Sequence, residues 1–121
     1  AAWPDKPIKI VVSFPAGGAS DIVARVIAEY LGKKLGQAVV VDNRPGAGGT
    51  LAAQVVAKAP ADGYTILLVN SQHVINPAAH LSLPYDTLRD FTGLAMVAEA
   101  PSVIAVLSIN PRGAMRAMRE F

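Results

Sequence analysis

The chain contains the same strand, turn and helix design twice, and this repeat restricts the possible folds more than any other feature of the sequence. Residues 11–28 are VVSFPAGGASDIVARVIA and residues 40–57 are VVDNRPGAGGTLAAQVVA. In both, a β-branched run predicts a strand, a proline with a glycine pair predicts a turn, and a polar residue opens a helical pattern. Alternating strands and helices indicate βαβ units, and therefore an α/β fold with a mainly parallel sheet and helices on both faces.

The rest of the chain extends the alternation. Short apolar runs predict strands at residues 8–13, 38–41 and 64–69. Helical spacing predicts helices at residues 20–35 and 51–59, the first ending at Gly36, and a short helical turn at residues 77–81 after a polar segment. The long apolar stretch 94–109 predicts two strands joined by a bend at residues 100–101, and residues 114–121 begin another helical pattern.

Composition excludes several classes of protein. The chain has 121 residues, of which 52% are hydrophobic and 17% are charged, so one domain with a real core is expected. Its apolar runs are shorter than the roughly 18 residues that a membrane span needs. The eleven basic residues are scattered and the net charge is only +2, which argues against nucleic acid as a partner. The absence of cysteine excludes disulfides, thiolate metal sites and cysteine nucleophiles.

The two glycine turns predict an anion site. Gly17-Gly18 and Gly48-Gly49 leave backbone N–H groups unobstructed, and the helix that follows each pair adds unpaired donors and the positive end of its dipole. If both strands are parallel, both turns lie at the carboxyl edge of the sheet, where open α/β sheets bind ligands. Neither turn continues into the Gly-Lys-Ser/Thr of a phosphate loop, and Leu51 stands where a dinucleotide fingerprint needs its third glycine.

Catalytic and metal sites find little support. Ser20 lacks the closing glycine of a hydrolase nucleophile elbow and is interpreted as a helix cap. His73 and His80 have no carboxylates near them at metal-ligand spacing. Asp21 follows a polar cap at a helix start, where a carboxylate favours the dipole and could orient the turn. No catalytic residue, metal or cofactor is therefore predicted.

Five motifs, in order, resemble one known family. They are Trp3-Pro4-Asp5-Lys6-Pro7-Ile8, Phe14-Pro15-Ala16-Gly17-Gly18 with Asp21, Asn43-Arg44-Pro45-Gly46-Ala47-Gly48-Gly49, Ala61-Asp62-Gly63-Tyr64-Thr65, and Leu83-Pro84-Tyr85-Asp86 with Asp90-Phe91. Each motif is weak alone, but their order and separations resemble those of the Bug receptors, the TctC-like substrate-binding proteins of tripartite tricarboxylate transporters. The resemblance covers essentially the whole chain.

The resemblance implies a lobe of a type II periplasmic binding protein, whose two lobes close on a small organic carboxylate. It also implies the membrane components of a tripartite transporter as partners. One carboxylate group of the ligand would be held by first-lobe turns through backbone amides and ordered water. The residues that match by position are Ala16, Gly17, Gly18, Asp21, Gly48, Gly49, Thr50, Ser71 and Gln72.

Members of that family are considerably longer than this chain. Residues 1–101 are expected to form the first lobe, and residues 102–121 the interlobe crossing and the start of an incomplete second lobe. Binding by these 121 residues is expected to be weak, because a small ligand needs walls on both sides. Ala1 and Ala2 would suit the mature end left by a signal peptidase, which agrees with a periplasmic location.

Two alternatives remain open at the level of sequence. One is an enzyme on the same scaffold that acts on a carboxylate or phosphate, for which Asp21 and His73 are the plausible bases. The other is a fragment that self-associates through its exposed interlobe surface.

Overall fold

The structure is a computed structural model, and it describes residues 2–79, 82–102, 112, 116 and 119. Strands and helices alternate within residues 8–79, as the repeat predicts. The strands are β1 (Ile8–Val12), β2 (Val39–Asn43) and β3 (Thr65–Leu68). The helices are α1 (Ala19–Leu35), the short 3-10 helix η1 (Ala47–Gly49), α2 (Thr50–Ala57) and α3 (Gln72–Ala79).

The described strands form a parallel sheet in the order β2-β1-β3. Ile8 of the central strand lies opposite Val39 of β2, and Lys9 lies opposite Thr65 of β3. Because the strands are parallel, the loops that follow them all leave from one edge of the sheet. The predicted parallel α/β arrangement is confirmed.

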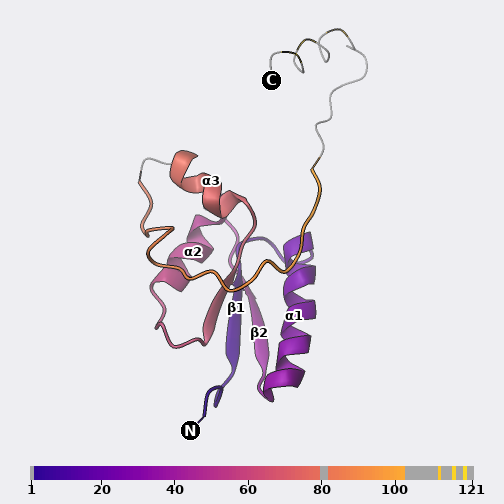
Figure 1. Ribbon diagram of the computed structural model, residues 1–121, viewed down its shortest axis with the longest axis vertical. Coiled ribbons are helices and arrows are strands. Elements are labelled where there is room, and N and C mark those ends of the chain that lie inside the picture. The colour runs from indigo at the N-terminus through magenta and orange to yellow at the C-terminus, as the bar shows by residue number, and fades with distance from the viewer. Residues whose placement is uncertain (1, 80–81, 103–111, 113–115, 117–118, 120–121) are drawn as a thin grey trace.

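Helices cover both faces of this sheet (Figure 1). On one face, Ala24 and Ala28 of α1 pack against Ile10 and Val12 in a buried cluster. Alanine at these positions lets the helix approach the strands closely, and burial of each large aliphatic side chain contributes about 1.5–3 kcal/mol. On the other side, α2 lies beside β3 and buries two further alanines, Ala52 and Ala53.

Helix α1 ends where the sequence predicts. Gly36 adopts a left-handed conformation (φ 68°, ψ 21°) and donates its N–H to the carbonyl of Gly32. Lys33 and Lys34 lie in the last turn, where positive charge complements the helix dipole. The chain is thereby turned back towards β2.

Helix α3 differs from the expectation. The sequence predicts a polar segment at residues 70–76 and a helical turn only from Pro77, but the helix begins at Gln72 and Pro77 lies inside it. The Asn70 side chain explains the earlier start, because its Oδ1 accepts the N–H of Gln72 at 2.9 Å. The Asn70 carbonyl also accepts the N–H of His73. A capped first turn therefore precedes the proline.

The apolar segment after the helices is also different from the prediction. Residues 94–102 form no strand, and Leu94 and Met96 are 76% and 79% exposed. A strand needs a backbone partner, and this segment pairs with none of the described strands. Residues 103–109 of the second predicted strand fall outside the described residues, as does most of the predicted helix 114–121. Within the described residues, no helix combines the length and apolar character needed to cross a membrane.

Candidate functional site

Three loops meet at the carboxyl edge of the sheet. The loop after β1 begins at Ser13, whose N–H bonds the carbonyl of Leu68 on β3. The loop after β2 begins at Arg44, whose N–H bonds the carbonyl of Val12 on β1 at 2.8 Å. The two glycine turns and the loop to α3 therefore start side by side, as the parallel arrangement predicts.

The first glycine turn is organised by Asp21, which is only 3% exposed. One carboxylate oxygen accepts the N–H of Gly17 at 2.8 Å and the Nε of Arg25 at 3.0 Å, and the other accepts the Nδ2 of Asn43 at 3.0 Å. The Gly17 N–H, with Arg25 and Asn43, lowers the pKa of Asp21 to about 2. Asp21 is thus ionised at neutral pH and is surrounded by donors from the chain itself.

These bonds determine which groups of the first turn remain for a ligand. Gly17 takes a left-handed conformation (φ 87°), and its N–H is already used by Asp21. Gly18 is the N-cap of α1, and its N–H makes only a long bond of 3.4 Å to the carbonyl of Pro15. Asn43, the last residue of β2, also donates to the carbonyl of Phe14 at 3.1 Å, so β2 holds the first turn in place.

The second glycine turn contains three successive left-handed residues. Ala47, Gly48 and Gly49 have φ values of 48°, 62° and 87°. The Gly49 N–H bonds the carbonyl of Gly46 at 3.0 Å, and Thr50 donates both its N–H and its hydroxyl to the carbonyl of Ala47. Gly49 and Thr50 are therefore used in holding the shape of the turn.

The bonds to Ala47 orient the next N–H group. In a trans peptide the C=O and N–H point in opposite directions, so with the Ala47 carbonyl held at the start of α2, the Gly48 N–H points away from that helix. None of the hydrogen bonds formed by the described residues uses this N–H. Gly48 thus offers an open donor in the second turn.

The third loop lies against the second turn. Gln72 donates its Nε2 to the Oδ1 of Asn76 at 2.8 Å, and Asn76 donates its Nδ2 to the carbonyl of Gly48 at 2.9 Å. The Gln72 side chain lies beside Gly48, with Cγ 3.9 Å from the position that a Cβ on Gly48 would take. Ser71 is exposed, and its carbonyl accepts the N–H groups of Val74 and Ile75.

Sequence reasoning missed three residues that shape this edge. Ser13 is 3% exposed and lies against Gly49, and Asn43 and Asn76 bind backbone groups of the two turns. Asn43 belongs to one of the five motifs, but the motif alone assigned it no role. The sequence predicts Asn76 in a polar segment, and no local signal marks it as buried.

His73 points into a separate aromatic cluster. Its ring stacks on Tyr85 with centroids 6.1 Å apart and meets the edge of Phe91 at 5.0 Å. Burial lowers the pKa of His73, so the ring is neutral at physiological pH. Its side chain therefore serves packing between α3 and the loop that follows.

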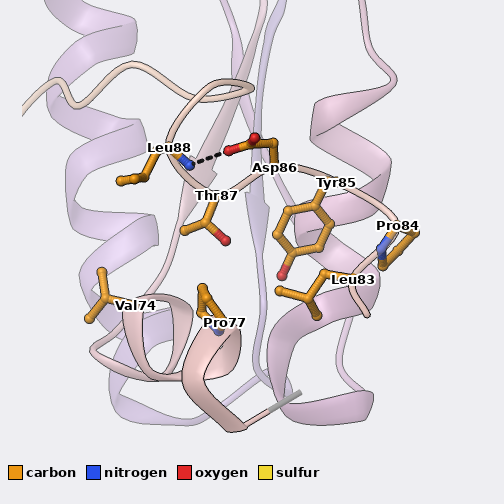
Figure 2. A pocket seen from close by; sticks show the side chains of 8 residues that line it. All are labelled: Val74, Pro77, Leu83, Pro84, Tyr85, Asp86, Thr87 and Leu88. Carbon is orange, nitrogen blue, oxygen red and sulfur yellow. Dashed lines mark hydrogen bonds between the residues drawn. The ribbon is translucent and has the colours of Figure 1, made fainter. Parts of the chain in front are cut away.

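A surface hollow of about 780 Å³ lies between α3 and this loop (Figure 2). Val74, Pro77 and residues 83–88 line it, and none of these is a predicted ligand residue. The Asp86 carboxylate accepts the N–H groups of Leu88 and Arg89, which fold the loop over α3. The hollow thus belongs to the packing of this loop and is distinct from the glycine turns.

Comparison with known proteins gives consistent matches. Residues 23–121 match the family described as "Tripartite tricarboxylate transporter family receptor" (TctC). A UPF0065 protein of Bordetella bronchiseptica is 50% identical over 105 residues, which cover 86% of this chain and 31% of that protein. Protein BugT of Bordetella pertussis is 43% identical over 112 residues, which cover 91% of this chain and 33% of that protein.

Solved structures agree in fold. MatC from Rhodopseudomonas palustris, solved with bound malate, superposes with a TM-score of 0.72 and 40% identity, covering 78% of this chain and 33% of its own. A second R. palustris protein, solved with adipate, superposes with a TM-score of 0.54 and 48% identity, and the match covers 55% of this chain and 22% of that protein. The chain spans about a third of the length of the curated relatives that it matches.

Proposed function

The chain belongs to the tripartite tricarboxylate transporter receptor family, and from this premise we propose that it forms the first lobe of a periplasmic receptor for a small organic carboxylate. In this proposal the carboxylate binds at the carboxyl edge of the sheet, where the two glycine turns begin α1 and α2. The membrane components of a tripartite transporter are the proposed partners of the whole receptor. The division between a first lobe, residues 1–101, and the start of a second belongs to the same proposal.

The observation that carries the proposal is the adjacency of the two turns. The Gly48 N–H is directed away from α2 and free of intrachain bonds among the described residues, and Gly18 stands at the start of α1. In this proposal the N-termini of α1 and α2 both face the bound carboxylate, and each stabilises its negative charge by typically about 0.3–1 kcal/mol. A carboxylate oxygen accepts such N–H groups well.

The predicted ligand residues fall into two roles within this proposal. Ala16, Gly18 and Gly48 contact the carboxylate through backbone N–H groups, and Ser71 and Gln72 approach it from the third loop. Gly17, Asp21, Gly49 and Thr50 hold the turns in shape through the bonds described above. Asp21 carries a negative charge close to the site, and its bonds to Gly17, Arg25 and Asn43 offset that charge.

The ligand class follows from chemistry and from the relatives. The two turns offer backbone donors, which suit one carboxylate group. One similar structure was solved with malate and another with adipate, which are both dicarboxylates. We therefore expect a di- or tricarboxylate. The enzyme alternative is not favoured, because Asp21 is held by three donors and His73 packs between Tyr85 and Phe91.

The test is an amide-detected NMR titration of the 121-residue chain with malate, adipate and citrate. Binding is expected to be weak, because one lobe gives only one wall of the cleft. Carboxylate should shift the Gly18 and Gly48 amide protons downfield, and the dimethyl ester of adipate should not. If millimolar di- and tricarboxylates leave both amides unchanged, the proposed site is wrong.

A further inference from the structure

Asn76 is a buried polar side chain whose role follows from the hydrogen bonds it makes. It lies in the middle of α3 and is only 1% exposed. Burial of an amide is costly unless its donors and acceptors are satisfied. Its Oδ1 accepts from Gln72 on the same helix, and its Nδ2 donates across to the Gly48 carbonyl, 28 positions earlier in the chain.

The second turn needs such a fixed contact. A left-handed conformation costs a residue with a Cβ about 1–2 kcal/mol, and Ala47 is one, while glycine is free to leave that conformation. Thr50 holds the peptide between Ala47 and Gly48 by two bonds to the Ala47 carbonyl. Asn76 holds the next peptide by its bond to the Gly48 carbonyl. Both peptide planes that flank the Gly48 Cα are thus anchored.

We propose that Asn76 is a positioning residue for carboxylate binding: by holding the Gly48 carbonyl it fixes the peptide after the Gly48 Cα, and so keeps the Gly48 N–H, on the peptide before it, facing the ligand. Gln72 sets the orientation of the Asn76 amide, because its Nε2 occupies the Oδ1 side and leaves Nδ2 towards Gly48. The chain of bonds from Gln72 through Asn76 to Gly48 makes the third loop and the second turn one unit. This inference rests on the proposed function for its effect on affinity.

The test replaces Asn76 with a group that can donate only when it is protonated. In Asn76→Asp, the shape is retained, but the ionised carboxylate faces the Gly48 carbonyl without a proton. Burial raises the pKa of the new carboxyl group, and once protonated it can donate to Gly48 while still accepting from Gln72. Relative to wild type measured at the same pH, affinity for adipate should fall about tenfold at pH 7.5 and recover as the pH is lowered to 5.

The same variant can be followed without ligand. The Gly48 and Gly49 amide shifts should depart from wild type at pH 7.5 and return towards it at pH 5. This measurement separates the two proposals, because a chain that never binds carboxylate refutes the function and leaves the role of Asn76 testable. A loss of affinity with no recovery at pH 5, or amide shifts that match wild type at every pH, would overturn the inference.

One control variant separates the hydrogen bond from the added charge. Asn70→Asp adds the same charge just before α3 and keeps the acceptor for the Gln72 N–H, so it reports the effect of charge without the bond to Gly48. Near Asn76, Tyr85 stays neutral because burial raises its pKa, and burial lowers the pKa of His73. The loop over α3 also carries Arg89, Asp90 and Asp86, and the N–H groups of Arg89 and Leu88 lower the pKa of Asp86. The other elements packed against α3, η1 and α2, carry no titratable side chain.

A wild-type measurement covers the case in which Asn76→Asp does not fold. The side-chain amide protons of Asn76 should exchange with solvent far more slowly than those of exposed Asn70, whose Nδ2 is not used in a bond to Gly48. Equal exchange rates for the two side chains would contradict the proposal.

Discussion

Substitution of Gly49 by alanine tests how tightly the second turn is built. Gly49 has a φ of 87°, and a Cβ placed there would lie 3.2 Å from the Cβ of Ser13. Ser13 has little freedom to move, because it is 3% exposed and its N–H bonds the carbonyl of Leu68. The variant therefore adds backbone strain and a steric contact at the same point.

Gly36 supplies the matched control for the strain. Its φ is 68°, and a Cβ placed there meets no atom within 4 Å. Gly36→Ala should lower the free energy of unfolding by about 1 kcal/mol through the left-handed conformation alone. Gly49→Ala should incur the same strain and about 1–3 kcal/mol more from crowding, so the total should be about 2–4 kcal/mol.

Urea denaturation followed by circular dichroism measures both variants against wild type. Both substitutions reduce the conformational entropy of the unfolded chain by the same amount, so the difference between their free energies of unfolding reports only the steric contact at Gly49. Ser13→Gly removes the opposing Cβ, so this change should be less harmful in the Gly49→Ala background than alone. Equal losses for Gly36→Ala and Gly49→Ala, or additive effects of Ser13→Gly, would refute the steric reasoning.

Three further predictions concern stability, each measured by urea denaturation. The pKa of Asp21 is lowered to about 2, mainly by the Gly17 N–H. The difference in free energy of unfolding between wild type and Asp21→Asn should therefore be complete above about pH 5 and decline as the pH falls towards 2, and a difference independent of pH would contradict this. Ile10→Ala should cost about 2–5 kcal/mol, because this side chain fills the core under α1; a loss below about 1 kcal/mol would contradict the packing. Glu29→Gln should change stability by less than about 0.5 kcal/mol, since its ion pair with Lys33 is exposed, and a larger loss would be unexpected.

The sequence predicted the sheet and the first two helices because their information is local. β-branched runs between prolines and glycines mark the strands, and alanine and valine at helical spacing mark the helices. The largest shift among the strands is at β2, which begins at Val39 and continues to Asn43, two residues beyond the predicted end. The polar Asp42 and Asn43 conceal that extension, although their backbones pair with Val11 and Val12.

The errors occur where tertiary contacts outweigh the local pattern. Pro77 favours a helix start, since its missing N–H is harmless in a first turn. The structure places it inside α3, at the loss of one N–H bond, because the Asn70 cap and the buried Asn76 fix the helix earlier. The apolar run after residue 94 predicts burial, but a sequence does not show which strand or helix would cover it. Residues 94–102 pair with none of the described strands and are exposed.

The candidate site also separates what local sequence predicts from what tertiary contacts decide. Local sequence locates two glycine turns, but it does not tell which N–H groups those turns leave for a ligand. That choice depends on Asp21, which uses the Gly17 N–H, and on Asn43, which reaches the first turn from the end of β2. In the second turn it depends on Thr50, which holds the Ala47 carbonyl, and on Asn76 of α3, which holds the Gly48 carbonyl. The two turns are alike in sequence and are held by different chemistry, a charged acceptor in one and a neutral donor in the other. Only the first should therefore lose its geometry when carboxylates are protonated, so acid should broaden or shift the Gly17 amide before the Gly48 amide.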